Sequence, residues 1–174
     1  MRFALFGNTY ETYKSVHAEQ LFAVLSKHND EVFVDNDFYN FLSQNQPFQF
    51  KAAGIIDDLE SLKPNMAISL GGDGTFLEAA RHVGGKGTPI LGINMGRLGF
   101  LSDYQAEDIP SAIEHIYNGT YRIEERTVLM VEDDRHSIQG HPYALNEVAV
   151  LKHDNSSMIS IDVEVNGEFL TTYQ

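Results

Sequence analysis

Residues 71–74 read Gly-Gly-Asp-Gly, and they combine a carboxylate with a backbone that a ligand can approach closely. An apolar run at 66–70 precedes them and apolar residues at helical spacing follow, so the segment reads as strand, tight loop and helix. Glycines allow sharp turns and close contacts. The unpaired N–H groups and the dipole at the start of a helix favour an anion. The loop therefore suits a phosphate group, with the carboxylate of Asp73 beside it as acceptor or base.

An ordinary turn between a strand and a helix is the alternative, because turns favour glycine and aspartate. Three glycines around one acid exceed what such a turn requires. Each glycine destabilises the flanking elements, relative to alanine, by roughly 0.5–1 kcal/mol. We therefore expect these glycines to serve a function.

Strand and helix patterns alternate through residues 1–118, as is typical of an α/β fold. Strands are expected at 2–6, 31–34, 66–70 and 89–93, and helices at 13–27, 55–62, 76–81 and 109–117. Most of 35–54 is left unassigned, although 37–42 suits a short helix. This alternation predicts a doubly wound parallel sheet, whose ligands bind beyond the carboxyl ends of the strands.

A second glycine-rich segment follows the strand at 89–93. Residues 92–101 read Gly-Ile-Asn-Met-Gly-Arg-Leu-Gly-Phe-Leu. The carboxyl ends of parallel strands meet at one edge of a sheet. We therefore expect this segment and the loop at 71–74 to form two walls of one crevice.

The pattern changes near Gly119, where alternating β-branched residues replace helical spacing. Strands are expected at 121–123, 127–132, 144–152 and 159–165, with turns at 133–134 and 166–167. We expect an α/β nucleotide-binding domain over 1–118 and the beginning of a β-rich domain over 119–174. The few strands expected over 119–174 cannot bury the faces of a β-sheet by themselves. We therefore expect the chain to be a fragment of a longer protein.

Asn146 and Glu147 interrupt the apolar pattern of the second part. By strict alternation one of them faces inward. A buried amide or carboxylate needs polar partners, and the vicinal hydroxyls of a ribose are suitable. The alternative is a β-bulge or edge strand on which both side chains are solvated. The pair alone does not decide between these arrangements.

The formal charge of −13 results from 25 acidic and 12 basic residues, and it repels nucleic acids and anionic membranes. We expect neither as a partner. A nucleotide complexed with a divalent cation is compatible with this charge. The chain lacks cysteine, a signal peptide and any run of transmembrane length. These features predict a cytoplasmic protein.

Other catalytic motifs are missing from the sequence. Residues 84–88 lack the spacing of a P-loop, and 7–10 lack the G-x-G-x-x-G fingerprint. Neither H-E-x-x-H nor G-x-S-x-G occurs. His136 and His141 flank a turn and are expected to be exposed, and the acids at 57–58 are expected in a loop or helix cap. No residue is assigned to a metal.

Three features together resemble the ATP-dependent NAD kinase family. They are the strand, loop and helix around 71–75, the 92–101 segment, and the Asn146-Glu147 pair in a β-rich second part. Their order and spacing match from about residue 64 to residue 150. Alone, the Gly-Gly-Asp-Gly loop is shared with diacylglycerol-type lipid kinases and is related to that of phosphofructokinase. The resemblance implies a Rossmann or phosphofructokinase-like sheet followed by a β-sandwich domain.

The resemblance implies transfer of the γ-phosphoryl group of ATP, with Mg²⁺, to the 2′-hydroxyl of the adenosine ribose of NAD, which makes NADP. Asp73 would be the general base on that hydroxyl, and Gly74 would line the NAD site. Asn146 and Glu147 would contact NAD, while Phe100 would lie against the adenine. The resemblance also implies a homo-oligomer, a dimer or tetramer.

Two departures from the family pattern matter. Position 78 is Glu where some relatives carry a base, so it receives no role. The family has a further Thr/Ser/Gly-rich nucleotide-binding segment beyond the point that corresponds to Gln174. We therefore expect the 174-residue chain by itself to bind nucleotide poorly and to be inactive. A diacylglycerol-type lipid kinase, which the net charge disfavours, and a non-catalytic nucleotide-binding module are the alternatives.

Overall fold

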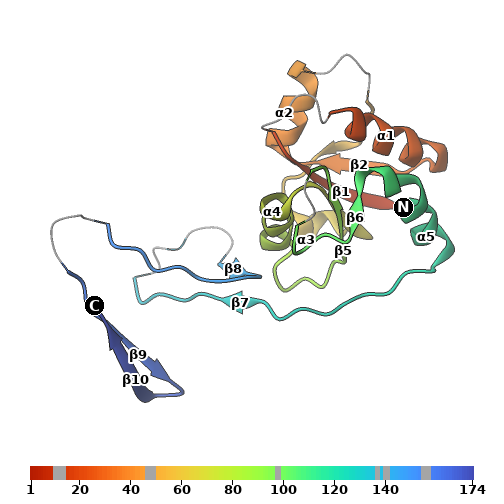
Figure 1. Ribbon diagram of the computed structural model, residues 1–174. Helices are drawn as coiled ribbons and strands as arrows, with labels where there is room; N and C mark the ends of the chain where they lie inside the picture. Colours follow the sequence, from red (N-terminus) through yellow and green to blue (C-terminus); the bar gives the residue numbers. More distant parts are fainter. Residues whose placement is uncertain (10–14, 46–49, 97–98, 136–137, 139–141, 154–157) are drawn as a thin grey trace.

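Six parallel strands form the central sheet of a computed structural model, which describes residues 1–174 except 10–14, 46–49, 97–98, 136–137, 139–141 and 154–157 (Figure 1). The strands are β1 (Arg2–Gly7), β2 (Glu31–Val34), β3 (Gly54–Ile55), β4 (Met66–Gly71), β5 (Ile90–Asn94) and β6 (Tyr104–Gln105). Their order is β3-β2-β1-β4-β5-β6. The order reverses between β1 and β4, and doubly wound sheets bind ligands at that point. The predicted fold is confirmed, and the Gly-Gly-Asp-Gly loop follows β4 at this position.

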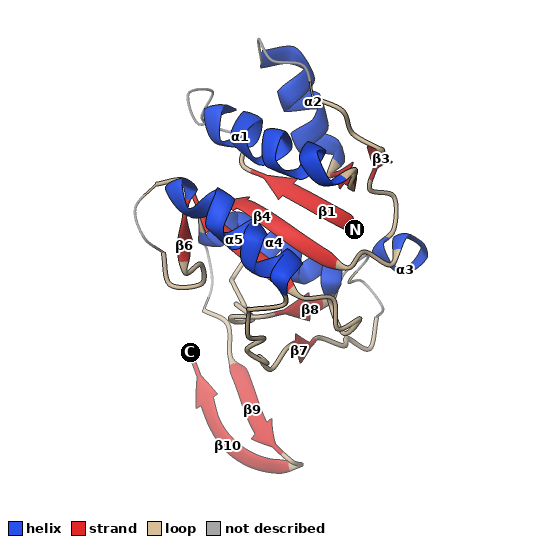
Figure 2. Cartoon of the chain, turned by 90° about the vertical axis from the view of Figure 1, so that its right-hand side faces the viewer, coloured by secondary structure: helices blue, strands red, loops and turns tan. Residues whose placement is uncertain are grey.

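Helices cover both faces of the sheet, which explains why the inner strands are apolar on both faces through most of their length. One face packs against α1 (Ser15–Leu25), α2 (Asn36–Asn45) and α5 (Ile109–Asn118), and the other against α3 (Leu59–Leu62) and α4 (Asp73–Val83). Figure 2 shows α1 and α2 on one side of β1. Two short 3₁₀ helices, η2 (Ser26–His28) and η3 (Ala106–Asp108), follow α1 and precede α5. None of the described helices has the length and apolar composition needed to cross a membrane.

The helix predicted over 55–62 is wrong in its first half. Ile55 belongs to the edge strand β3, which pairs with β2, and only the last residues of the range form α3. The N-cap of α3 is Asp58, whose carboxylate accepts hydrogen bonds from the N–H groups of Glu60 and Ser61, both at 3.0 Å. Asp58 is therefore the helix-cap acid that the sequence predicted. The helix suggested at 37–42 is present as α2.

This cap makes the stability of the fold depend on pH. The hydrogen bonds from Glu60 and Ser61 lower the pKa of Asp58 below its ordinary value of 3.8. A carboxyl group whose pKa is lower in the folded state stabilises the fold above the unfolded pKa, and that contribution is lost as the pH falls through the folded pKa. We expect Asp58→Ala to lower the urea midpoint at neutral pH and to matter progressively less below about pH 4.

Urea unfolding of the wild type and of Asp58→Ala at a series of pH values tests this expectation. Asp57→Ala is the matched control, because Asp57 is an exposed acid just before the cap. The same difference in midpoint at every pH would contradict the proposed role of the Asp58 charge.

Gly7 ends β1 against an aromatic ring. A Cβ added to Gly7 would lie 2.2 Å from Cζ of Phe38, a residue of α2 that is 2% exposed. Forcing extra volume into a packed core costs about 1–3 kcal/mol. We expect Gly7→Ala to lower the unfolding free energy by about this amount in urea. Gly85→Ala is the control, because its added Cβ would meet no atom within 4 Å. Equal stability of the two variants would contradict the packing described.

Beyond α5, the described residues form two antiparallel pairs of strands instead of a larger sheet. The strands are β7 (Leu129–Met130), β8 (Tyr143–Ala144), β9 (Ile161–Val165) and β10 (Glu168–Tyr173). The predicted strand at 121–123 is wrong, and those at 127–132 and 144–152 are much too long. An alternating pattern forms a strand only where a neighbouring strand accepts its hydrogen bonds, and in the described part of the chain these segments have few strands beside them.

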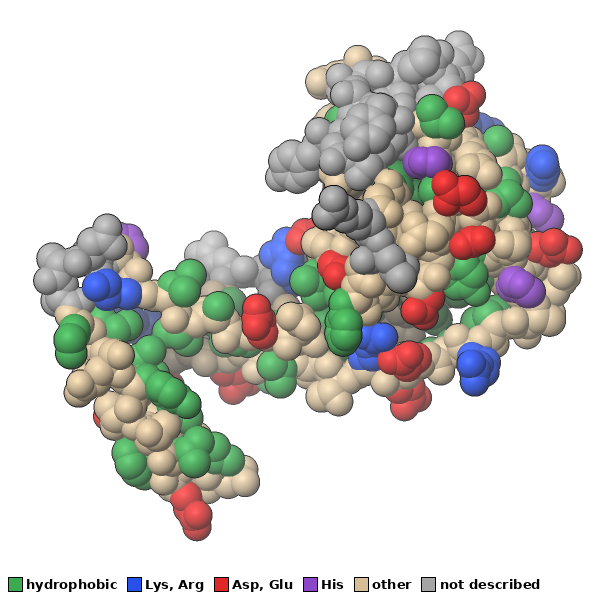
Figure 3. Space-filling view, viewed as in Figure 1, with side chains coloured by type: hydrophobic (Ala, Val, Ile, Leu, Met, Phe, Trp, Pro, Cys, Tyr) green, Lys and Arg blue, Asp and Glu red, His purple; other side chains and the backbone are tan. Residues whose placement is uncertain are grey.

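The hairpin turn predicted at 166–167 is confirmed. It joins β9 to β10, and Asn166 and Gly167 have φ of 54° and 82°. Two consecutive positive φ values are what a two-residue hairpin turn requires. The hairpin extends away from the parallel sheet (Figure 1) and carries exposed apolar side chains (Figure 3), among them Phe169 and Leu170.

Candidate active site

The loop between β4 and α4 leaves its backbone open to a ligand. Gly72 is the N-cap of α4 and Asp73 is its first residue, so the N–H groups of the first turn have no partner within the helix. A Cβ added to Gly72 or Gly74 would meet no atom within 4 Å. A Cβ added to Gly71 would lie 2.2 Å from Oγ1 of Thr75. Gly72 and Gly74 therefore border open space, whereas Gly71 makes room for a side chain of the loop itself.

The second glycine-rich segment holds the carboxylate of Asp73. The N–H groups of Phe100 and Leu101 donate to its Oδ2 and Oδ1, at 2.9 and 3.1 Å. These bonds confirm the prediction that the two glycine-rich segments lie together. A carboxylate has about four lone-pair sites, so each oxygen can still accept a further hydrogen bond from a hydroxyl group.

The side chains of Phe100 and Leu101 differ in burial. Phe100 is 83% exposed, whereas Leu101 is 8% exposed. The burial of Leu101 and the hydrogen bonds to Asp73 therefore hold the backbone in place here, while the ring of Phe100 remains accessible. An exposed aromatic ring on a fixed backbone suits stacking against a flat, aromatic ligand.

Asn146 and Glu147 lie outside the cluster around Asp73. Both are exposed in the segment after β8, so the arrangement with two solvated side chains is the one that forms. β8 packs at the far end of α4, where a Cβ on the C-cap Gly84 would lie 2.7 Å from the ring of Tyr143. The hydrogen bonds described for Asp73 come from the second glycine-rich segment and not from Asn146 or Glu147.

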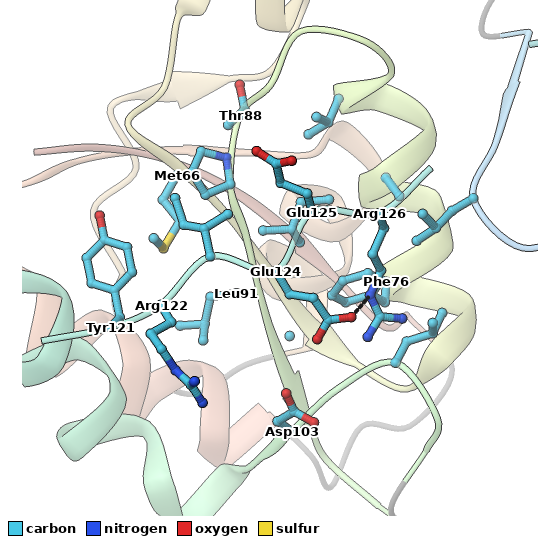
Figure 4. A pocket seen from close by; sticks show the side chains of 18 of the residues that line it. Met66, Phe76, Thr88, Leu91, Asp103, Tyr121, Arg122, Glu124, Glu125 and Arg126 are labelled. Carbon is cyan, nitrogen blue, oxygen red and sulfur yellow. Dashed lines mark ion pairs between the residues drawn. The ribbon is translucent and has the colours of Figure 1, made fainter. Parts of the chain in front are cut away.

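The structure also contains a cavity of about 1050 Å³, which none of residues 71–75 lines. It is bounded by α4, β5, α5 and the extended segment 121–126 (Figure 4). Leu101 lines it, but Asp73 does not. Its rim carries charges of both signs, including the ion pair of Arg126 and Glu124 at 3.0 Å. The cavity offers neither the hydrogen-bonded carboxylate of Asp73 nor an open helix N-terminus, so we place the candidate site at the loop.

Glu78 is paired with neighbours on its own helix. Arg81 donates two hydrogen bonds to its carboxylate, at 2.6 and 3.2 Å, and Nε2 of His82 lies 3.1 Å from Oε1. Burial raises the pKa of Glu78, but the bonds and charges of Arg81 and His82 outweigh burial, and the net shift is downward. Glu78 therefore interacts with Arg81 and His82 of its own helix, and we assign it no role in the site.

Metal ligands do not gather at the site. Among the described residues, no group of three or more His, Asp or Glu side chains could hold a metal ion. His136 and His141, which were expected to be exposed, lie outside the described residues.

The backbone contacts of Asp73 are the part of the site that sequence reasoning missed. From the sequence, Phe100 was a candidate because of its aromatic ring. The structure adds the hydrogen bonds that the N–H groups of Phe100 and Leu101 donate to Asp73, and the close approach of Gly99 to the same carboxylate. The glycine at position 99 is a weak signal for such a contact, because glycine also occurs in many turns that bind nothing.

Comparisons with known proteins agree on one family. A family model described as the ATP-NAD kinase N-terminal domain matches residues 3–121. The NAD kinase of Bacteroides fragilis is 53% identical over 175 residues, which cover 100% of this chain and 60% of the relative. The NAD kinase of Porphyromonas gingivalis is 34% identical over 172 residues, which cover 99% of this chain and 59% of the relative. The chain therefore spans about 60% of the length of these curated relatives.

Two solved structures share the fold. Yeast NADH kinase complexed with NADH has a TM-score of 0.73 at 18% identity, over 99% of this chain and 54% of that chain. An NAD kinase from Archaeoglobus fulgidus in complex with ATP has a TM-score of 0.65 at 23% identity, over 99% of this chain and 57% of that chain. The structures support the fold, and the family model covers more than half of the sequence. As its motifs predicted, the chain belongs to the NAD kinase family.

Proposed function

We propose that the full-length protein is an NAD kinase, which transfers the γ-phosphoryl group of ATP to the 2′-hydroxyl of the adenosine ribose of NAD. The observation that carries the proposal is the position of the Asp73 carboxylate. It lies at the open N-terminus of α4 and accepts hydrogen bonds from the N–H groups of Phe100 and Leu101. Phosphoryl transfer needs positioned reactants, neutralised charge and a group that orients or deprotonates the nucleophile. The family and the named relatives support the choice of substrates.

Asp73 is the general base of the proposed reaction. Its carboxylate accepts the proton of the 2′-hydroxyl, whose oxygen forms a bond to the γ-phosphorus. The bond from that phosphorus to the oxygen bridging to the β-phosphate breaks, and ADP leaves. The N–H groups of Phe100 and Leu101 hold the carboxylate in place throughout. The N–H groups at the start of α4 contribute positive potential for phosphate oxygens.

Four further residues are proposed to contact NAD. Gly74 lines the NAD site, since the lack of a side chain leaves open space beside the loop. Phe100 lies against the adenine, which its exposed ring permits. Asn146 and Glu147 contact NAD from the second part of the chain, where both are exposed.

ATP is proposed to bind as its Mg²⁺ complex. The formal charge of −13 opposes the approach of a bare nucleotide. Magnesium in such sites is held by one or two carboxylates together with substrate phosphates and water. In the proposed complex the phosphates of ATP and water supply most of the ligands of the ion, and no residue of this chain is assigned to it. When bound, the ion would neutralise charge that develops on the phosphates.

We also propose the division into an α/β domain over 1–118 and the beginning of an NAD-binding β domain over 119–174. The C-cap of α5 is Gly119, with φ of 64°, and the described strand pairs beyond it are antiparallel. A cytoplasmic homo-oligomer, either dimer or tetramer, is part of the proposal. Light scattering on the purified full-length protein would measure its mass.

The test of the proposed function is formation of NADP by the purified full-length protein. NADP is measured with a dehydrogenase specific for it, after incubation with ATP, NAD and Mg²⁺. We expect product only when all three are present, and none after chelation of the divalent cation. Diacylglycerol in place of NAD is expected to give no phosphorylated product. A folded protein that forms no NADP would refute the proposal.

A further inference from the structure

Gly99 makes the closest approach to the carboxylate of Asp73. A Cβ built on Gly99 would lie 2.2 Å from Oδ1 and 2.7 Å from Cγ, and real Cβ atoms essentially never come within 3.0 Å of another heavy atom. Any side chain at position 99 must therefore displace something. The obstructing atoms belong to the end of a side chain and not to the backbone, so a shift of the carboxylate is the change that costs least and we expect the fold to be kept.

The group that would move is the one that accepts both hydrogen bonds from the segment. The bonds from Phe100 and Leu101, at 2.9 and 3.1 Å, are already of ordinary length. A contact in which donor and acceptor are separated by more than about 3.5 Å is no longer a hydrogen bond. Withdrawal of the carboxylate from a Cβ at position 99 would therefore break or badly distort them.

Phe100 thus takes part in two contacts, one through its backbone and one proposed for its ring. The N–H group of Phe100 holds Asp73, while its ring is exposed and is proposed to bind the adenine. The hydroxyl that Asp73 would deprotonate belongs to the ribose attached to that adenine. The distance between the base and the held nucleotide therefore depends on how closely residues 99–101 approach the carboxylate.

We propose that Gly99 is a positioning residue for the kinase reaction: its missing side chain lets the main chain of 99–101 close on Asp73 and so fixes the base relative to an adenine held by Phe100. This inference rests on the proposed function. Gly99 acts through Asp73 and touches none of the reacting atoms.

Steady-state kinetics of Gly99→Ala in the full-length protein test the inference. We expect kcat for NADP formation to fall by about 10- to 100-fold, since a misplacement of about 1 Å can cost this much. The KM for ATP and the urea midpoint should remain close to those of the wild type. Gly85→Ala is the matched control, because its added Cβ meets no atom within 4 Å and it should keep full activity. A Gly99→Ala variant with wild-type kcat would overturn the inference.

A double-mutant cycle with Asp73→Asn distinguishes positioning from a general structural effect. If Gly99 acts only through the carboxylate, Gly99→Ala should lower the residual kcat of Asp73→Asn by less than about twofold. The same fold loss in both backgrounds would show that Gly99 acts independently of Asp73, and the inference would be wrong.

Amide hydrogen exchange gives a readout that does not depend on activity. The amides of Phe100 and Leu101 should exchange faster in Gly99→Ala than in the wild type, and at the wild-type rate in Gly85→Ala. Unchanged exchange in Gly99→Ala would overturn the inference. If the wild type forms no NADP, the proposed function fails, whereas the exchange rates still decide whether Gly99 positions the carboxylate.

Discussion

Asp73→Asn is expected to lower kcat for NADP formation by the full-length protein about 10²- to 10⁴-fold, the range that general base catalysis contributes. Asparagine has nearly the same shape but cannot take the proton of the attacking hydroxyl. Its single side-chain oxygen can accept from Phe100 or Leu101 but not from both in the present geometry. We expect the KM for NAD to change by less than about threefold, because the lost interaction is made in the transition state.

Asp103→Asn is the matched control for this prediction. Asp103 is an exposed acid shortly after Leu101, and it lines the neighbouring cavity instead of the loop. Initial rates at saturating ATP and varied NAD separate kcat from KM for both variants. If Asp73→Asn retained kcat within about twofold of the wild type, Asp73 would not be the base.

Ile68→Ala is expected to lower the free energy of unfolding by about 2–5 kcal/mol. Ile68 lies in β4, has no exposed surface and belongs to the larger of the two core clusters. β4 pairs with both β1 and β5, so the surrounding sheet cannot easily collapse into the cavity that the truncation leaves. Urea unfolding of the full-length protein measures the change.

Two companion variants make this result specific to burial. Ile68→Val removes one methyl group and should cost about 0.5–1.5 kcal/mol. Val16→Ala truncates a side chain that is 63% exposed and should cost less than about 0.5 kcal/mol. Equal losses for Ile68→Ala and Val16→Ala would contradict the position of Ile68 in the core.

Most of the parallel sheet could be predicted because its signals are local. The strands at 2–7, 66–71 and 90–94 are apolar runs that end in glycine or asparagine, as expected for strands covered on both faces. The helix after Asp73 follows from a glycine N-cap and a glycine stop on either side of an amphipathic stretch. The identities of neighbouring residues suffice to predict these elements, because the pattern that marks each of them lies within the element itself.

The predictions failed where the conformation depends on partners far along the chain. The strand predicted at 121–123 does not form, because none of the described strands lies beside this segment to pair with its backbone. Ile55 has helical spacing to Leu59 and Leu62, yet pairing with β2 draws it into an extended edge strand. Asn146 and Glu147 are both exposed, contrary to strict alternation, because the strand expected around them stops at Ala144.

The sequence by itself determined the parallel sheet, the position of the Gly-Gly-Asp-Gly loop at its carboxyl edge and the family. Only the tertiary structure decided how Asp73 is held, since its donors at Phe100 and Leu101 lie 27 and 28 residues away. No local pattern encodes such a contact. It arises because β4 and β5 are neighbours in register, from Ala67 opposite Ile90 to Gly71 opposite Asn94. That pairing brings the segments after both strands to one edge, where Gly99 leaves room for the carboxylate.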